Sequence, residues 1–259
     1  FFIHTNLDAE DFKICICKHE NIKKWQDYIP TTNGVLIGGF DLLNEWMVRS
    51  EVRDALSKLY VRNLNTNTEE ELVITDEKVI SPGASLMQKD RNTNKLYIAY
   101  HSPKTPGKTY IYDVATKEKK LVKTEIVPSG HNPDDYIVQR LNCDSHDGKK
   151  IPLTITRHKK TKLDGSANLL LYGYGSYGAS MGPGFSSSRL SLINRNIIWV
   201  TTHVRGGMER GMNWWKSGKL LKKMNSFKDY ISSAKFLIEK KYTNKGKIIG
   251  MGGSAGGLL

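Results

Sequence analysis

The chain contains two patterns of apolar and polar positions, one on either side of residue 130. In residues 1–130, short runs of β-branched and aromatic residues alternate with clusters of turn-forming residues, and helical spacing is rare. These runs predict strands over residues 12–17, 34–37, 58–64, 96–100 and 109–114, and the first residues of the chain also read as a strand. The pattern therefore predicts a first domain made of β-structure.

The predicted β domain contains a repeated unit. The run at residues 58–64, followed by a polar turn and a short apolar run, recurs at residues 109–114 with the same continuation. Tyr60 and Tyr110 are 50 residues apart, a spacing within the range of β-propeller blades. A β-sandwich with two similar hairpins is the alternative interpretation.

Residues 131–259 have the alternation of strands and helix that is typical of an α/β sheet. Strands are predicted over residues 137–141, 151–156, 169–172, 197–201 and 247–250, with a hairpin turn at 145–148. A helix is predicted before the last strand, because Ser226 and Asp229 resemble a capping box. An apolar stripe follows that should pack against the sheet, formed by Phe227, Tyr230, Ile231, Ala234 and Ile238.

Charge is distributed unevenly along the chain, which has a net charge of +13 over 259 residues. Residues 1–136 contain 18 Lys and Arg against 20 Asp and Glu, whereas residues 137–259 contain 21 against 6. The break supports two domains, and a basic domain raises the question of nucleic-acid binding. The basic residues are dispersed and are not interleaved with stacking aromatics, so we predict a solvated basic surface and no nucleic-acid partner.

The sequence carries no pattern for export or membrane insertion. No signal-peptide pattern precedes the first strand, and no apolar run approaches the roughly 18 residues that span a bilayer. The odd number of cysteines, Cys15, Cys17 and Cys143, suits a reducing compartment better than a disulfide framework. We therefore expect a cytoplasmic protein without membrane contact, and we predict neither a cofactor nor a metal.

The motif that indicates chemistry follows the predicted strand at 247–250. Gly252, Ser254 and Gly256 form the Gly-x-Ser-x-Gly pattern of a nucleophile elbow, a sharp turn between strand and helix on which the serine is lifted clear of the sheet. Glycines two residues to either side avoid a clash in this turn. The free N–H of Ala255 can then donate to an oxyanion. A glycine-rich turn that occurs by chance is the alternative, but the strand before it and the apolar residues after it favour the elbow.

A serine becomes a useful nucleophile only when a histidine removes its proton and a carboxylate orients that histidine. In α/β-hydrolases the chain order is serine, acid, histidine. The histidines here all precede Ser254, so each is predicted to be a surface or structural residue: His4, His19, His101, His131, His146, His158 and His203.

Four ordered motifs give the chain a resemblance to the prolyl oligopeptidase family of serine peptidases, and among them to oligopeptidase B. The motifs are residues 172–178, 188–190, 203–207 and 252–257, and residues 5–12, 25–30 and 39–41 are similar to propeller segments of the same enzymes. The resemblance implies the C-terminal blades of a β-propeller over residues 1–130. It further implies the first part of an α/β-hydrolase domain over residues 131–259, cut off after the nucleophile elbow.

The resemblance also implies roles for three residues. Ser254 matches the nucleophile, and Tyr174 matches the hydroxyl that joins the Ala255 N–H in the oxyanion hole; a packed aromatic is the alternative for Tyr174. The implied activity is cleavage of short peptides after Arg or Lys. Gly182 and Gly184 stand where oligopeptidase B commonly has acidic residues that hold the residue before the cleaved one, so a basic preference there is not implied.

The five residues after Ser254 contain neither the acid nor the histidine of a triad. We therefore expect the isolated chain to have no useful peptidase activity, to pack loosely with apolar surface exposed, and to need a complementing C-terminal chain. A non-enzymatic remnant of a split gene and an esterase of the hydrolase class are the alternatives.

Overall fold

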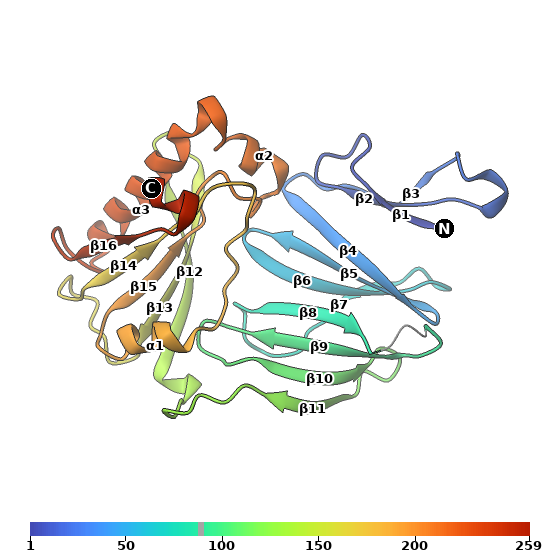
Figure 1. Ribbon diagram of the computed structural model, residues 1–259, viewed down its shortest axis with the longest axis horizontal. Helices are drawn as coiled ribbons and strands as arrows, with labels where there is room; N and C mark the ends of the chain where they lie inside the picture. Colours follow the sequence, from blue (N-terminus) through green and yellow to red (C-terminus); the bar gives the residue numbers. More distant parts are fainter. Residues whose placement is uncertain (88–90) are drawn as a thin grey trace.

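The computed structural model describes residues 1–87 and 91–259, and its described strands form four sheets (Figure 1). Three small antiparallel sheets occupy the N-terminal part. The first has the order β1-β2-β3, the second β4-β5-β6-β7 and the third β11-β10-β9-β8. Their strands are β1 (Phe2–Thr5), β2 (Lys13–Ile16), β3 (Gln26–Ile29), β4 (Val35–Leu43), β5 (Trp46–Arg53), β6 (Leu56–Asn63), β7 (Glu69–Glu71), β8 (Ser81–Leu86), β9 (Lys95–His101), β10 (Lys108–Asp113) and β11 (Lys119–Thr124).

The second and third sheets pack face to face through one apolar core. That core joins the residues that alternate inward along β5, β6, β9 and β10, among them Leu59, Ile98 and Tyr112. Strand β8 contacts β6 of the neighbouring sheet, whereas every residue of β11 is exposed at the opposite edge. Successive four-stranded meanders packed in this way are blades of a propeller, so the predicted partial β-propeller is confirmed and the β-sandwich alternative is wrong.

The fourth sheet has the order β12-β13-β15-β14-β16 and belongs to the C-terminal part. Its first three strands pair antiparallel, while β14 runs parallel to both β15 and β16. The elements of this part are η2 (Pro133–Asp135), β12 (Tyr136–Asp144), β13 (Lys150–His158), β14 (Leu169–Tyr172), α1 (Ser187–Ile193), β15 (Ile198–Thr202), α2 (Gly211–Lys216), η3 (Leu220–Lys222), α3 (Met224–Glu239), β16 (Ile248–Met251) and η4 (Ser254–Leu258); a further 3₁₀ turn, η1 (His19–Asn21), lies in the N-terminal part.

Helices cover both faces of this sheet (Figure 1). Leu169 and Leu171 of β14 lie in the core that includes Leu237 of α3, whereas Leu170 lies in the core that includes Ile193 of α1. Because alternate residues of a strand point to opposite faces, α1 and α3 lie on opposite sides of the sheet. This is the layered arrangement of an α/β-hydrolase, and the predicted partial α/β-hydrolase fold is confirmed.

The predicted start of helix α3 is wrong. The helix begins at Met224, so Ser226 lies inside it and does not cap it. The Ser226 hydroxyl donates instead to the carbonyl oxygens of Arg205 and Gly218, at 2.5 and 3.2 Å. The carboxylate of Asp229 accepts hydrogen bonds from Arg205, so both polar residues serve tertiary contacts and not the helix end.

The predicted packing face of α3 needs a related correction. The buried residues of the helix are Ser226, Asp229, Ser233 and Leu237, while Ile231 is half exposed. Tyr230 and Ala234 pack against the sheet core as predicted. The packed face is partly polar because its serine and aspartate side chains find buried hydrogen-bond partners, which an apolar count does not detect.

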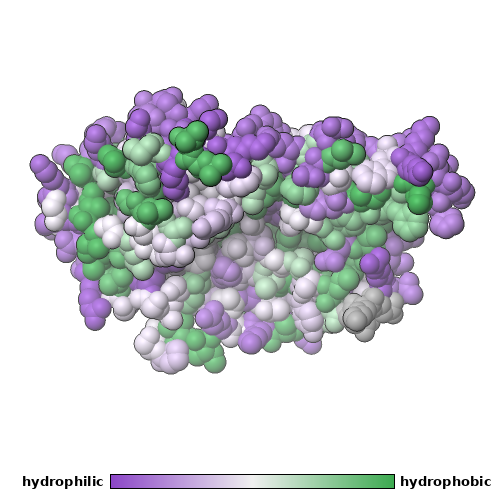
Figure 2. Space-filling view, turned by 45° about the horizontal axis from the view of Figure 1, so that its top comes forward, coloured by the Kyte–Doolittle hydropathy of each residue, from purple (hydrophilic) through white to green (hydrophobic). Residues whose placement is uncertain are grey.

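Several large apolar side chains are exposed. They include Leu220, Leu221, Met224 and Leu258 near the end of the chain. Figure 2 shows apolar residues interspersed with hydrophilic ones across the face that it presents. Within the described part of the chain, no helix is both long and apolar enough to cross a membrane.

Candidate active site

Ser254 is the first residue of the 3₁₀ helix η4, directly after the tight turn that leaves β16. Its backbone is left-handed, with φ at +51°, a conformation that few non-glycine residues adopt. The side chain is exposed at the carboxyl end of β16. A left-handed, exposed serine directly after a strand is the feature that the nucleophile elbow predicts, although β16 itself is largely exposed.

The two flanking glycines are required by close contacts across this turn. A Cβ atom at Gly252 would clash with the carbonyl oxygen of Gly256. A Cβ atom at Gly256 would lie 2.8 Å from the carbonyl oxygen of Gly173, closer than real side chains approach a backbone. The geometry therefore agrees with the sequence-based reason for glycine at both positions. At Gly256 the close contacts are with the neighbouring loop, which also excludes a side chain.

That neighbouring loop, the glycine-rich loop at residues 173–178, carries Tyr174. It follows β14, which is hydrogen-bonded to β16, so the loop and the elbow leave adjacent strands at the same sheet edge. Tyr174 is half-buried, and a Cβ atom at Gly256 would be 3.1 Å from its ring atom Cδ2. Gly175 has φ at +60° and packs against Val204, which leaves no space for a side chain. The structure thus brings Tyr174 beside the elbow, as an oxyanion role requires.

A groove of about 370 Å³ opens beside the elbow. Ala255 and Leu258 form one wall, Ser176 and Tyr177 of the glycine-rich loop form another, and the third wall is the segment 215–223. Tyr177 is largely exposed. The third candidate residue, Ala255, therefore shares this groove with the glycine-rich loop.

The histidine hydrogen bonds of the described residues are made with partners other than the candidate nucleophile. Across the described residues, no hydrogen bond joins a histidine to Ser254. His203 is fully buried beside Thr154, with 2.8 Å between Nε2 and the threonine Oγ1, and burial lowers its pKa well below the ordinary value. Burial raises the pKa of the neighbouring Glu209 to about 7. The N–H of Ala55 in the propeller donates to the Glu209 carbonyl at 2.8 Å, so Glu209 belongs to the contact between the domains.

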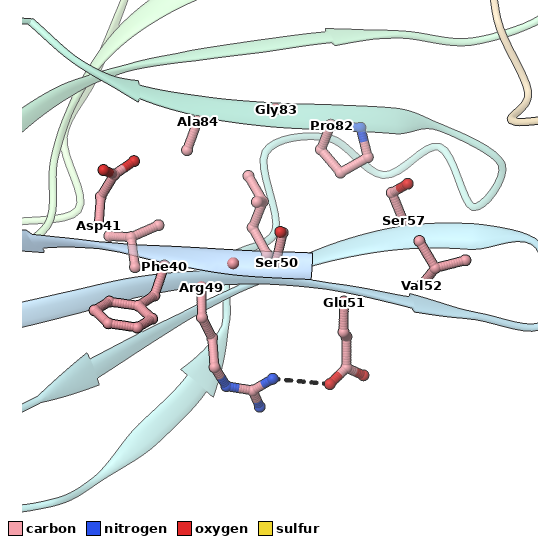
Figure 3. Close-up of a pocket in the computed structure, with 13 residues that line it drawn as sticks. Phe40, Asp41, Arg49, Ser50, Glu51, Val52, Ser57, Pro82, Gly83 and Ala84 are labelled. Carbon is pink, nitrogen blue, oxygen red and sulfur yellow. Dashed lines mark hydrogen bonds and ion pairs between the residues drawn. The ribbon is translucent and has the colours of Figure 1, made fainter. Parts of the chain in front are cut away.

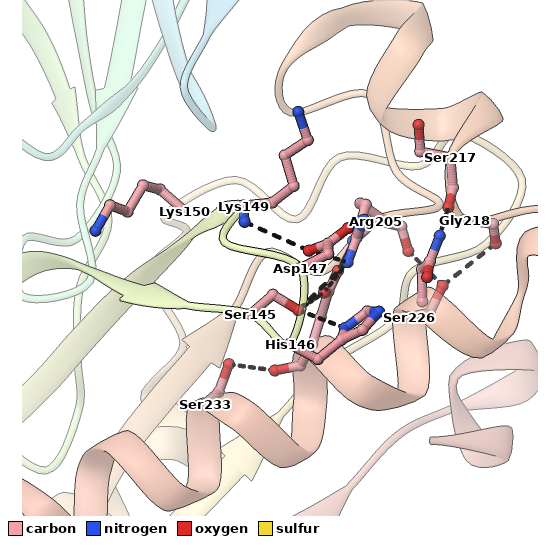
Figure 4. Close-up of polar contacts among 12 residues, drawn as sticks. Ser145, His146, Asp147, Lys149, Lys150, Arg205, Ser217, Gly218, Ser226 and Ser233 are labelled. Carbon is pink, nitrogen blue, oxygen red and sulfur yellow. Dashed lines mark hydrogen bonds and ion pairs between the residues drawn. The ribbon is translucent and has the colours of Figure 1, made fainter.

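Sequence reasoning missed a buried ion-pair network behind the glycine-rich loop (Figure 4). Arg205, which follows β15, donates through Nε and Nη2 to Asp229 of α3, at 2.9 and 2.6 Å. It also donates through Nη1 to Asp147 in the β12–β13 turn, at 2.6 Å. The Ser145 hydroxyl donates to Asp229 at 2.5 Å. The signal available in the sequence was an aspartate on the packed face of a helix, which must find a buried partner.

Two further grooves lie outside the elbow. One, of about 380 Å³, separates β5 from β8 in the propeller, with Arg49 and Glu51 paired at its edge at 2.9 Å (Figure 3). The other, of about 630 Å³, lies between the residues after the glycine-rich loop and α1. Arg189 lines this second groove, stacks on Trp199 and donates to the Gly184 carbonyl at 2.9 Å. No carboxylate is among the described residues that line it.

Propeller blades joined to an α/β sheet with helices on both faces define the class of propeller-bearing α/β-hydrolase folds. Sequence models agree: that of the Prolyl oligopeptidase family matches residues 183–259, and that of the Prolyl oligopeptidase N-terminal beta-propeller domain matches residues 1–125. The chain belongs to the prolyl oligopeptidase family and is similar to oligopeptidase B. The predicted family is thereby confirmed.

Curated relatives and solved structures align with two thirds or more of this chain. Dipeptidyl aminopeptidase BI from Pseudoxanthomonas mexicana is 37% identical over 99% of this chain, and Protease 2 from Moraxella lacunata is 38% identical over 68%. The alignments span 36% and 26% of those relatives. Oligopeptidase B from Trypanosoma brucei, solved in a closed form with covalently bound antipain, superposes with a TM-score of 0.91 at 32% identity, over 99% of this chain and 38% of that one. The chain therefore spans about a third of the length of its relatives.

Proposed function

We propose that this chain contributes the nucleophile and the oxyanion hole of a serine-type oligopeptidase. Ser254 is the nucleophile, and the Ala255 N–H and the Tyr174 hydroxyl are the two oxyanion donors. The observation that carries the proposal is the left-handed Ser254 turn, which two obligatory glycines close directly against the Tyr174 loop. Ten other non-glycine residues of the described chain also have a left-handed backbone, so the conformation of Ser254 supports the proposal together with the glycine contacts and the exposed position after β16.

The chemistry follows from that geometry. The Ser254 oxygen attacks the peptide carbonyl, its proton passes to a histidine, and the two donors stabilise the negative charge on the former carbonyl oxygen. The histidine then protonates the leaving amine, and water releases the acyl group. We propose that the histidine and its acid come from polypeptide outside these 259 residues, and that the chain alone has no useful activity.

We further propose that the substrates are short peptides cleaved after Arg or Lys, by likeness to oligopeptidase B. The groove that contains Gly182 and Arg189 bears a guanidinium and no carboxylate among its described residues. Burial lowers the pKa of Arg189, and an uncompensated cation there would not favour a basic side chain. We therefore expect weak dependence on the residue before the cleaved one. The three buried, free cysteines suit a cytoplasmic location.

A substrate panel on the assembled peptidase, meaning this chain joined to or mixed with the polypeptide that bears the acid and histidine, tests the function. Fluorogenic amides of blocked Arg and Lys are expected to turn over at least about tenfold faster than blocked Pro. Gly-Arg and Arg-Arg amides should be cleaved at similar rates.

Other results on the same panel would replace the proposal. A strict need for a free amino terminus would indicate a dipeptidyl aminopeptidase, as one relative is named. Turnover of acyl esters without peptides would indicate an esterase. A stable complex that contains the acid and histidine and yet cleaves nothing would favour a non-enzymatic remnant.

Tyr174→Phe should lower kcat of the assembled peptidase by about 10²–10³ with little change in KM. The hydroxyl contributes mainly to the transition-state oxyanion, while the ring that packs beside Gly256 is retained. Steady-state kinetics on a blocked Arg amide measures both parameters. Tyr177→Phe in the same loop is the matched control and should change kcat little; an equal effect of the two changes would refute the role of Tyr174.

A further inference from the structure

Lys223 lines the groove beside Ala255 and hydrogen-bonds to the glycine-rich loop. It is the residue directly before helix α3 and is half-buried. Its Nζ donates to the carbonyl oxygen of Gly175 at 2.5 Å and to the hydroxyl of Ser176 at 2.9 Å. Both acceptors directly follow Tyr174 in the chain, so the ammonium holds the peptide next to the candidate oxyanion donor.

The rest of the loop is fixed by packing and by backbone contacts. Val204 fills the space beside Gly175, and the N–H of Gly178 donates to the carbonyl oxygen of Gly206 at 2.9 Å. These contacts do not satisfy the Gly175 carbonyl, to which Lys223 donates. A charged donor forms a stronger hydrogen bond to a carbonyl oxygen than a neutral donor does. Without the Lys223 ammonium, the Gly175 carbonyl would lose this partner.

The position of Lys223 carries an energetic cost. Burial lowers its pKa, because the ammonium is partly withdrawn from water. A neutral side chain would fill this space without that cost. Exposed Lys222, one residue earlier, shows that a lysine in this segment can remain in water. The cost is offset by the two hydrogen bonds to the loop.

We propose that Lys223 is a positioning residue for the oxyanion hole. By holding the Gly175 carbonyl and the Ser176 hydroxyl, it fixes the backbone that directs the Tyr174 hydroxyl toward the oxygen of the tetrahedral intermediate. Lys223 acts through Tyr174 and takes no part in proton transfer. The proposal rests on the oxyanion role proposed above, but its structural half can be tested without any catalysis.

The structural half is tested by amide hydrogen exchange on the assembled peptidase, with no measurement of catalysis. Lys223→Met removes the ammonium and keeps the aliphatic stem, so exchange at Gly178 and Ala179 should become roughly 10- to 100-fold faster. Exchange around Leu237, in the buried part of α3, should not change. Lys222→Met is the matched control and should leave the loop as in the parent, and Lys223→Arg should restore most of the protection. Unchanged loop exchange in Lys223→Met, or equal loosening of the loop and α3, overturns the proposal.

The catalytic half uses a double-mutant cycle in the assembled peptidase. Lys223→Met should lower kcat about 10-fold or more while KM changes less than about twofold. In the Tyr174→Phe background the same change should cost almost nothing, because the hydroxyl that it positions is absent. Fully additive losses would overturn the proposed route through Tyr174. A loosened loop together with full activity of Tyr174→Phe would instead count against the proposed oxyanion role, so the two failures are distinguishable.

Discussion

Replacing Ser254 by alanine is expected to lower kcat of the assembled peptidase by about 10⁶-fold, the loss that removal of a triad nucleophile causes. Ser254 is the residue on the strained turn that the elbow glycines make possible, so another hydroxyl cannot take its place without rebuilding that turn. Residual turnover should come from the oxyanion donors and substrate binding alone. Alanine and serine are about equally tolerant of a left-handed backbone, and the substitution removes only the hydroxyl, so the variant should keep its fold and its KM.

The measurement combines single-turnover kinetics on a blocked Arg amide with labelling by a fluorophosphonate. The parent should form a covalent adduct on Ser254, and Ser254→Ala should form none. Ser187→Ala, at an exposed position that begins α1, is the matched control and should label and turn over as the parent. Robust cleavage by Ser254→Ala would show that another residue is the nucleophile.

The fold was predictable wherever an apolar run fills one strand or helix. The strand at residues 169–172 was predicted at its observed bounds, because all but the last of its side chains are buried on one face or the other of a covered sheet. Strand β5 was missed, because its buried positions include Arg49 and Glu51, which satisfy each other as an ion pair. Strand β11 is exposed along its whole length and owes its position to pairing with β10. Strand pairing through backbone hydrogen bonds does not depend on apolar side chains, so the pattern of apolar positions does not predict such a strand.

The candidate site divides in the same way. The elbow was predictable because steric limits on one short turn demand glycines at fixed spacing, and the structure shows the contacts that impose them. Lys223 and Arg205 were not predictable, because their partners lie 48 and 24 residues away in sequence. Among the many basic residues in this half of the chain, only the folded structure shows which ones are withdrawn from water and which partners they meet. The boundary between the domains at residues 130 and 131 stays a prediction.

Asp229→Asn is expected to lower the free energy of unfolding by about 3–5 kcal/mol, the cost of leaving a buried charge without its partner. The side chains of Asp229 and Arg205 are 0% and 3% exposed, so water cannot replace the lost carboxylate. The remaining partner of Arg205, Asp147, is 35% exposed and is held on a hairpin turn, where it compensates the charge less well. Urea denaturation of the chain, followed by circular dichroism, measures the change.

Two comparisons distinguish the effect of an unpaired charge on stability from the effect of a general loss of packing. Asp144→Asn breaks the exposed pair with Lys150 and should cost at most about 1 kcal/mol. Replacing both partners, as Arg205→Met with Asp229→Leu, should recover much of the stability lost in Asp229→Asn, since no buried charge is then left alone. If the double variant is instead less stable than Asp229→Asn, the hydrogen bond from a backbone N–H to the Asp229 side chain contributes more to stability than the charge of that side chain does. Its hydrogen bond from the Arg205 N–H, at 3.0 Å, would then be the main link between α3 and the loop behind Tyr174.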